Sequence, residues 1–139
     1  MSKTIIAVLL AAALASNVAT AATADFAGAW VDAAPASGIA RLTVTATNGT
    51  VMLHVFGQCE QDICDWGSAP GHGYSLSVTS GDIRIVTADF DFGRRRERLT
   101  LRLAPGGLRY RLFTEFADAS PRMDYESAGF LKKTAPPPP

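Results

Sequence analysis

The dipeptide Asn48-Gly49 constrains the fold more than any other feature of the sequence, because it favours a two-residue β-hairpin turn. The runs on either side alternate apolar and polar residues, as half-buried strands do. Folding the chain back here aligns apolar residues in the pairs Ala46–Val51, Val44–Leu53 and Leu42–Val55. The opposite face carries the pairs Thr45–Met52, Thr43–His54 and Arg41–Phe56. A shift by one residue would exchange the faces, so this agreement predicts an antiparallel hairpin.

Four more turns produce similar alignments, at Ser80-Gly81, residues 91–93, Pro105-Gly106 and residues 118–121. The first two predict the inward pairs Val78–Ile83, Leu76–Ile85, Tyr74–Thr87, Ile83–Leu101, Ile85–Leu99, Thr87–Glu97 and Asp89–Arg95. The other two predict the pairs Leu103–Leu108, Leu101–Tyr110, Leu99–Leu112, Phe116–Met123 and Thr114–Tyr125. The turns divide the chain into eight expected strands, over residues 26–32, 38–47, 50–57, 73–79, 82–90, 94–103, 108–117 and 122–132.

We therefore expect an all-β domain in which eight strands form an antiparallel up-and-down meander. Such a sheet has to bury one face and protect its edge strands. Closing the first strand on the last into a barrel does both, and eight strands are common in such barrels. The alternative is a β-sandwich, in which two sheets pack face to face.

The N-terminus has the pattern of a secretory signal peptide. A basic residue, Lys3, precedes the uncharged run 5–14, and small residues offer cleavage after Ala21 or Ala24. The apolar run is half the length of a membrane-spanning helix, which needs about 20 residues. We therefore predict a signal peptide at 1–24, one domain at 25–132 and a Pro-rich tail at 133–139. The mature chain is expected to be secreted or periplasmic, without insertion into the membrane.

Cys59 and Cys64 are the only cysteines, and export to an oxidising compartment predicts that they form a disulfide. The alternative is a zinc site that adds His54 and His72, but the cysteine spacing and the export argue against it. No metal or other cofactor is expected. Once Lys3 is removed, acidic residues outnumber basic ones by one, so binding to nucleic acid is not expected.

Two resemblances follow from short motifs. The opening Phe26-Ala27-Gly28-Ala29-Trp30 resembles the first strand of lipocalins and related calycin barrels such as avidin. That resemblance implies that Trp30 plugs one end of the barrel and that the open end binds a small ligand. The stretch from Gly57 through Cys59-x4-Cys64-Asp65-Trp66-Gly67 is similar to a group of small secreted bacterial proteins without an established activity.

The longest connections of the expected barrel, 33–37, 58–72, 91–93 and 118–121, gather at one end. Inward positions become polar near this end, which suits a ligand site at a barrel mouth. The candidate ligand-binding residues are Trp66, His72, Tyr74, Asp89, Arg95, Glu97 and Thr114. Two structural interpretations compete: Asp89 and Arg95 form an ion pair that seals the core, and Trp66 folds back as a lid.

Arginines dominate one outward face of the sixth and seventh strands. They are Arg94, Arg96, Arg98, Arg102, Arg109 and Arg111. The register places Arg102 opposite Arg109, and like charges at opposite positions are destabilising, so an anion or an acidic partner is expected to offset them. The alternative is a solvated surface on which Arg96 pairs with Glu115.

No catalytic motif stands out, because His54 is expected to face outward and His72 lies between two glycines. We therefore expect a non-enzymatic binding protein that takes a small polar or amphipathic ligand at the disulfide-loop end. The rival is a protein-interaction module, such as an inhibitor of a secreted hydrolase. A hollow barrel favours the first function, whereas a filled one moves the function to the outer surface.

Overall fold

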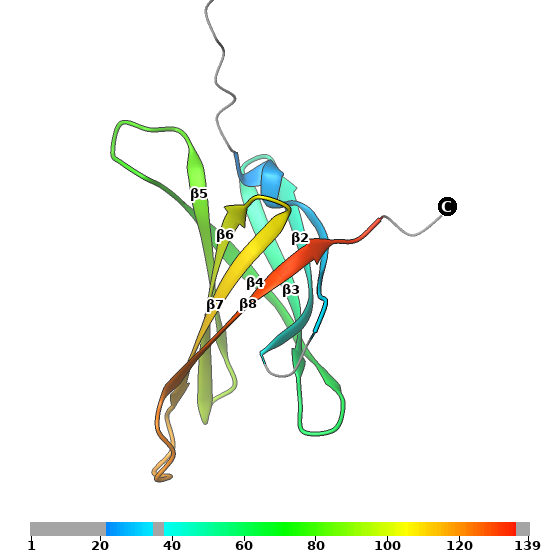
Figure 1. Ribbon diagram of the computed structural model, residues 1–139. Helices are drawn as coiled ribbons and strands as arrows, with labels where there is room; N and C mark the ends of the chain where they lie inside the picture. The colour runs from blue at the N-terminus through cyan, green and yellow to red at the C-terminus, as the bar shows by residue number, and fades with distance from the viewer. Residues whose placement is uncertain (1–21, 35–37, 136–139) are drawn as a thin grey trace, which may run out of the picture.

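The computed structural model describes residues 22–34 and 38–135, which form a closed antiparallel barrel (Figure 1). Strands that neighbour each other in the barrel are also neighbours in the chain. They are β1 (Gly28–Asp32), β2 (Ile39–Thr47), β3 (Thr50–Gln58), β4 (Ile63–Ser75), β5 (Ile83–Asp91), β6 (Arg95–Ala104), β7 (Gly107–Phe116) and β8 (Tyr125–Lys133). A short 3-10 helix, η1 (Thr23–Phe26), precedes them. The all-β meander and its closure are confirmed, and the β-sandwich alternative is wrong.

The described residues cover the predicted boundaries at the two ends of the chain only in part. The predicted signal peptide lies outside the described residues as far as residue 21, and so do residues 136–139 of the predicted tail and 35–37 of the first loop. η1 begins at Thr23, two residues before the predicted domain start at residue 25. Among the described residues, no helix has the length and apolar character needed to cross a membrane.

The barrel closes between the first and last strands, as expected. β1 and β8 pair antiparallel through Trp30–Lys133, Val31–Lys132 and Asp32–Leu131. The Thr134 backbone N–H extends this seam by donating to the Ala29 carbonyl at 2.8 Å.

The turns with the clearest sequence signals have the predicted registers. Asn48 and Gly49 both have positive φ angles, 51° and 77°, as a two-residue turn of type I′ requires. Every pair predicted for this hairpin is present between β2 and β3. The pairs predicted around Pro105-Gly106 are all present between β6 and β7, and Thr114 pairs with Tyr125.

The alignment predicted for β4 is wrong. This strand begins at Ile63 instead of residue 73, and Tyr74 pairs with Ile85 instead of Thr87. The Gly- and Pro-rich segment has the composition of a loop, but it serves here as a barrel strand with small inward residues. A Cβ atom at Gly71 would overlap the Leu53 side chain, so the missing side chain makes room for the core.

The alignment predicted for β5 is also wrong. Val86 instead of Ile83 pairs with Leu101, which shifts the register by three residues. An odd shift turns the other face of a strand inward. Val86, Ala88 and Phe90 are therefore buried, whereas Asp89 is exposed.

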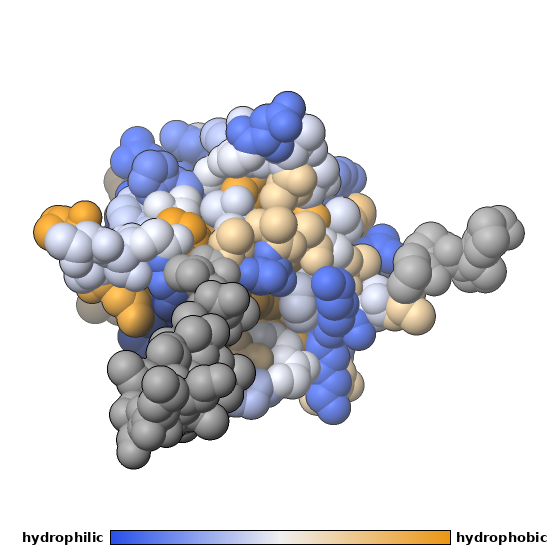
Figure 2. Space-filling model, turned by 90° about the horizontal axis from the view of Figure 1, so that it is seen from above, coloured by the Kyte–Doolittle hydropathy of each residue, from blue (hydrophilic) through white to orange (hydrophobic). Residues whose placement is uncertain are grey.

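The connection between β4 and β5 follows from these two corrections. Leu76 and Val78, expected in a strand, belong to the connection over residues 76–82 and are exposed. Seen from above, apolar residues project on the left of the molecule, where this connection lies (Figure 2).

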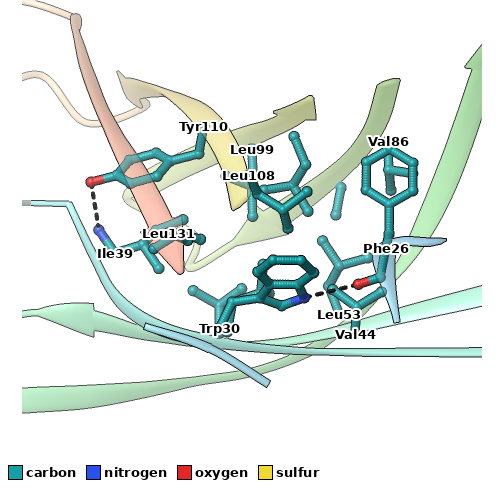
Figure 3. Packing of buried hydrophobic residues seen from close by; sticks show 14 of the residues in the cluster. Phe26, Trp30, Ile39, Val44, Leu53, Val86, Leu99, Leu108, Tyr110 and Leu131 are labelled. Atoms are coloured by element: carbon teal, nitrogen blue, oxygen red, sulfur yellow. Dashed lines mark hydrogen bonds between the residues drawn. The ribbon is translucent and has the colours of Figure 1, made fainter. Parts of the chain in front are cut away.

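The barrel interior is filled by packed side chains (Figure 3). At the end beside η1, Phe26 and Trp30 are buried, and the Trp30 indole Nε1–H donates to the Phe26 carbonyl at 2.9 Å. Further along, the buried Tyr110 ring crosses towards β2, where its hydroxyl accepts from the Ile39 backbone N–H at 3.3 Å. Trp30 and Phe26 thus fill the end of the barrel beside η1.

Candidate functional site

The open end of the barrel lies opposite η1, at the bottom of Figure 1. The β3–β4, β5–β6 and β7–β8 connections lie there. The expected covering loop 58–72 is wrong, because β3 and β4 continue as a hairpin to a short tip at residues 59–62.

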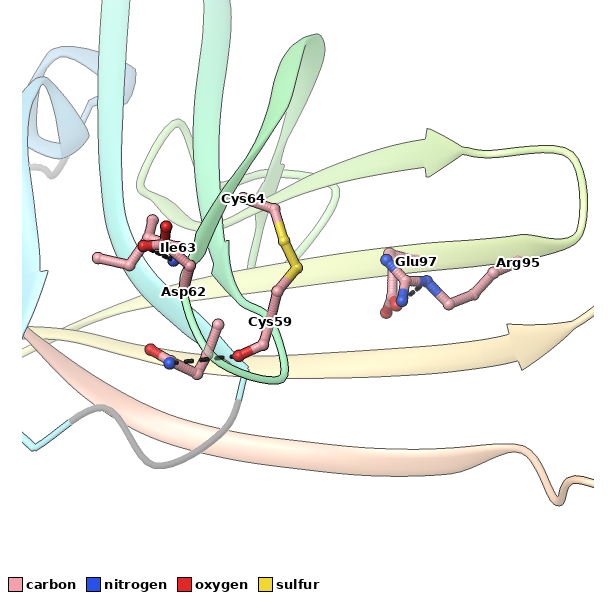
Figure 4. Close-up of a disulfide and its surroundings, with 7 residues drawn as sticks. Cys59, Asp62, Ile63, Cys64, Arg95 and Glu97 are labelled. Carbon is pink, nitrogen blue, oxygen red and sulfur yellow. Dashed lines mark hydrogen bonds and ion pairs between the residues drawn. A yellow bond between two sulfur atoms is a disulfide. The ribbon is translucent and has the colours of Figure 1, made fainter.

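The predicted disulfide fixes this hairpin tip (Figure 4). Cys59 and Cys64 are joined, with their Cα atoms 5.8 Å apart. Inside the tip, the Cys59 backbone N–H donates to the Asp62 carbonyl at 2.8 Å, and the Ile63 N–H donates to the Asp62 carboxylate at 2.7 Å. The tip is therefore cross-linked and braced by its own backbone.

Trp66 covers the open end from β4. A register shift opposite Val55 and Phe56 accompanies a positive φ of 79° at Gly67, which is typical of a β-bulge. The half-buried indole packs against the backbone of Gly57, where a Cβ atom would overlap it. Its ring also meets the ring of Phe90 edge-on at 5.9 Å. Trp66 is therefore a lid, but one carried by a strand instead of a loop.

Beside this lid, an acidic residue is buried in the barrel wall. Glu97 is 3% exposed and accepts a hydrogen bond from the Thr114 hydroxyl at 2.7 Å. The Arg95 Nε lies 2.9 Å from the Glu97 carboxylate (Figure 4). Burial raises the pKa of Glu97, while the Thr114 hydrogen bond and the Arg95 charge partly oppose that rise.

The Arg95 guanidinium extends from Glu97 towards aromatic rings at the mouth. Its carbon lies 5.7 Å from the Trp66 ring centroid and 5.1 Å from that of Phe92, within the range of cation–π attraction. Four of the predicted site residues, Trp66, Arg95, Glu97 and Thr114, therefore form one cluster. Phe92 was missed, because the three-residue loop expected there placed it at a turn.

The other three predicted ligand residues lie elsewhere, on the outer surface. His72 and Tyr74 project outward from β4, where their rings meet at 4.7 Å. Asp89 faces outward and pairs with Arg98 at 2.8 Å, so the predicted Asp89–Arg95 ion pair is wrong. The register of β5 is the reason that Tyr74 and Asp89 face outward. Both were expected inward because the predicted alignment turned the wrong face of β5 towards the core.

The rim of the open end carries exposed large apolar residues on three hairpin tips. They are Ile63, Phe92, Met123 and Tyr125, which we call the rim residues. Met123 and Tyr125 were expected inside the barrel but are 81% and 54% exposed, because β8 starts only at Tyr125. Exposed apolar side chains therefore gather on three tips at one end of the barrel.

Short-range hydrogen bonds brace the tips that carry the rim residues. The Asp91 carboxylate accepts from the Gly93 N–H at 2.8 Å, and the Asp124 carboxylate accepts from the Phe116 N–H at 2.8 Å. Asp118 pairs with Arg122 at 2.7 Å. Hydrogen bonds from Ser120, together with Arg122, hold the pKa of Asp118 below its usual range. Contacts within each tip therefore hold its backbone in place.

A shallow cleft of about 580 Å³ separates the disulfide tip from the barrel wall. It is lined by Gln58, Cys59, Glu60, Gln61, Asp62 and Arg95. Carbonyl, carboxylate and guanidinium groups therefore surround this space.

The outer face of β2, β3 and β4 carries a row of side chains that satisfy one another. His54 stacks on Phe56 at 4.8 Å and contacts the Asp65 carboxylate at 2.7 Å. Arg41 lies 4.1 Å over the Phe56 ring. Hydrogen bonds from the Gly67 N–H and from His54 lower the pKa of Asp65.

All six predicted surface arginines lie on β6, on β7 or in the connection that precedes β6. Arg98 pairs with Asp89 at 2.8 Å, Arg96 with Asp91 at 3.6 Å and Arg111 with Glu126 at 3.1 Å. Arg96 does lie opposite Glu115, as expected, although its ion pair is with Asp91. Arg94 is exposed in the β5–β6 connection, and Arg102 lies opposite Arg109 in the predicted register.

Within the described ranges, no three His, Cys, Asp or Glu side chains are grouped so that they could hold a metal ion. No family model, curated protein or solved structure matches this chain. The site therefore has to be interpreted from its own geometry.

Proposed function

We propose that this chain is an exported, non-enzymatic binding module that recognises a partner protein with the rim of its open end. The filled interior supports this proposal most directly. Large side chains such as Tyr110, Leu99 and Leu112 are buried along the barrel, in space that an internal ligand would need. Recognition then falls to the outer surface.

The rim residues supply the anchors for such a contact. Exposed aromatic and aliphatic residues that enter pockets of a partner carry most of the binding energy in protein interfaces. Because the disulfide and the tip hydrogen bonds already order these segments, little conformational entropy remains to be lost on binding. Projecting tips of this kind fit a concave partner surface, such as the cleft of a secreted hydrolase.

The surroundings of the histidines favour a non-enzymatic role. His54 is engaged with Phe56 and Asp65, and His72 is packed against Tyr74. Glu97 is directed at Thr114 and Arg95 inside the wall. These contacts suit structure better than proton transfer to a substrate.

A small polar ligand in the cleft beside the disulfide tip is the second candidate. The Arg95 side chain is 38% exposed and lines this cleft, while Glu97 holds it in place. A ligand with a carboxylate could accept hydrogen bonds from the guanidinium there. This function requires Arg95, whereas the partner-binding function requires the rim residues.

Export and a calycin-like origin belong to the same proposal. The disulfide suits an oxidising compartment, and the Trp30 plug suits a calycin-like barrel. The fold also favours cleavage after Ala21 over Ala24. The Ala22 nitrogen donates to the Asp25 carboxylate at 2.6 Å, and cleavage after Ala24 would remove half of η1.

Site-specific photo-crosslinking in the native compartment tests the partner. We would place p-benzoylphenylalanine at Met123 on the rim and, as a matched control, at Val78, which is apolar and fully exposed at the opposite end. A discrete crosslinked protein is expected from Met123 but not from Val78. Equal crosslinking from both positions, or none from Met123, would refute the rim proposal. A small molecule retained in native mass spectrometry and lost in Arg95→Gln would support the second candidate.

A further inference from the structure

Two arginines on the outer wall of the barrel lie opposite each other without a balancing acid. Arg102 of β6 pairs in register with Arg109 of β7. On its other side, Arg102 lies opposite Ile85 of the neighbouring strand β5. Arg109 likewise lies opposite Phe130 of the neighbouring strand β8. Neither arginine makes an ion pair with any residue of the described chain.

The other arginines on the strands of this face each have an acidic residue nearby. Arg98 lies opposite Asp89, to which it is bonded. Arg96 has an acid opposite it on each neighbouring strand, and Arg111 reaches Glu126. The unbalanced positive charge is therefore confined to the row of Arg102 and Arg109.

This arrangement costs stability in the free protein. Cβ atoms at opposite positions of antiparallel strands lie about 4.5–5.5 Å apart, so the two side chains are neighbours, and like charges there are destabilising. An oxyanion between the guanidinium groups would remove the repulsion and accept hydrogen bonds from both.

The two arginines also line the edge of a groove of about 570 Å³ on the outer wall. Phe130 and Ala128 of β8 supply apolar side chains to it. Its floor includes the backbone at Gly129, where Tyr110 packs from inside the barrel and a Cβ atom would overlap the Tyr110 ring. The groove thus places an apolar surface beside two cationic groups.

We propose that this groove binds a small amphipathic oxyanion, with its carboxylate or phosphate between Arg102 and Arg109 and its apolar part against Phe130 and Ala128. The site lies on the wall formed by β6, β7 and β8, whereas the rim lies at the open end (Figure 1). It does not depend on the function proposed for the rim.

Calorimetric titration of the mature protein with octyl phosphate, below the concentration at which it forms micelles, tests this site. We expect Arg102→Gln and Arg109→Gln each to weaken binding by about tenfold or more, since a hydrogen bond to a charged group contributes roughly that factor. Arg98→Gln is the matched control: it removes the same charge from the same strand and should leave the affinity unchanged. The ligand-free Arg102→Gln protein should also melt at a higher temperature than wild type, because the repulsion is gone. If Arg102 had only a structural role, Arg102→Gln would not both raise the melting temperature and weaken the binding of octyl phosphate.

Two further ligands identify the chemistry. Inorganic phosphate should bind at least about tenfold more weakly than octyl phosphate, because it leaves the apolar wall uncovered. Flotation with phosphatidylglycerol vesicles separates a membrane source from a soluble one, and Arg109→Gln should abolish any flotation. Equal affinity for the two phosphates, no binding of octyl phosphate, or an equal loss in Arg98→Gln would each overturn the proposal.

Discussion

The contact between Gly57 and the Trp66 indole leads to a quantitative prediction about the lid. Gly57 lies on β3 opposite Cys64, and a Cβ atom there would overlap the indole. Gly57→Ala therefore forces Trp66 away from the open end. The substitution adds one methyl group, so its effect on stability should come from the displacement of the Trp66 ring.

The cost can be estimated from two opposing terms. Burying a large apolar side chain contributes roughly 1.5–3 kcal/mol, and displacement of the indole loses most of it. A Gly-to-Ala change at an ordinary backbone position contributes about 0.4–1 kcal/mol of stability through the unfolded chain. We expect Gly57→Ala to lower the free energy of unfolding by about 1–2 kcal/mol.

A double-mutant cycle with Trp66→Ala checks this mechanism by urea denaturation followed by circular dichroism. Without the indole, Gly57→Ala should be neutral or slightly stabilising, which gives a coupling energy of about 1.5–3 kcal/mol. Gly106→Ala is the control, because Gly106 has a φ of 81° with no atom near its missing Cβ. It should cost about 1–2 kcal/mol in both backgrounds. An equal cost of Gly57→Ala with and without Trp66 would refute the reasoning.

Three further predictions concern Glu97, the mature N-terminus and the disulfide. Burial raises the pKa of Glu97, so the folded protein keeps this proton to higher pH than the unfolded chain, and the free energy of unfolding should fall as pH rises from the ordinary value of 4.5 through the raised pKa. Glu97→Gln should flatten that part of the pH profile, and an unchanged slope would contradict the assignment. Mass spectrometry of exported protein should find Ala22 as the first residue; a chain that starts at Asp25 would show that η1 is dispensable. Alkylation without reductant should label neither Cys59 nor Cys64, and reduction should red-shift the emission of Trp66 in a Trp30→Phe variant. Labelled cysteines would contradict the disulfide. Emission of Trp66 that is already water-like before reduction would contradict its role as a lid held by the disulfide.

The sequence predicted those parts of the fold that local turn chemistry determines. Asn48-Gly49 and Pro105-Gly106 each join strands whose apolar residues alternate, so turn and pattern specify the same register. The opposed pair Arg102 and Arg109 followed from that register alone.

The sequence failed where tertiary packing overrides local preference. Gly71 and its neighbours have the composition of a loop, yet they form β4 because Leu53 and Val51 fill the space in front of them. This error moved the start of β4 by ten residues. The wrong loop length at residues 91–93 then inverted β5, so an outward acid, Asp89, was assigned to the mouth.

Four of the seven predicted mouth residues do lie together, for a physical reason. Glu97 and Thr114 face each other across β6 and β7, whose register was predicted correctly. Trp66 was placed at the mouth because a disulfide limits how far the chain can travel from Cys59. The exposure of Met123 could not be foreseen, since it depends on how early β7 and β8 separate.

The seam between β1 and β8 also sets the order of events when the chain is made. Its partners stand almost at opposite ends of the described chain, in the pairs Trp30–Lys133, Val31–Lys132 and Asp32–Leu131. Contacts over such sequence separations form late, because a long loop has to close first. We expect a chain that is still emerging from a ribosome or a membrane pore to keep both edges of its sheet unpaired. The barrel therefore cannot close until residues 131–133 have emerged and can pair with residues 30–32.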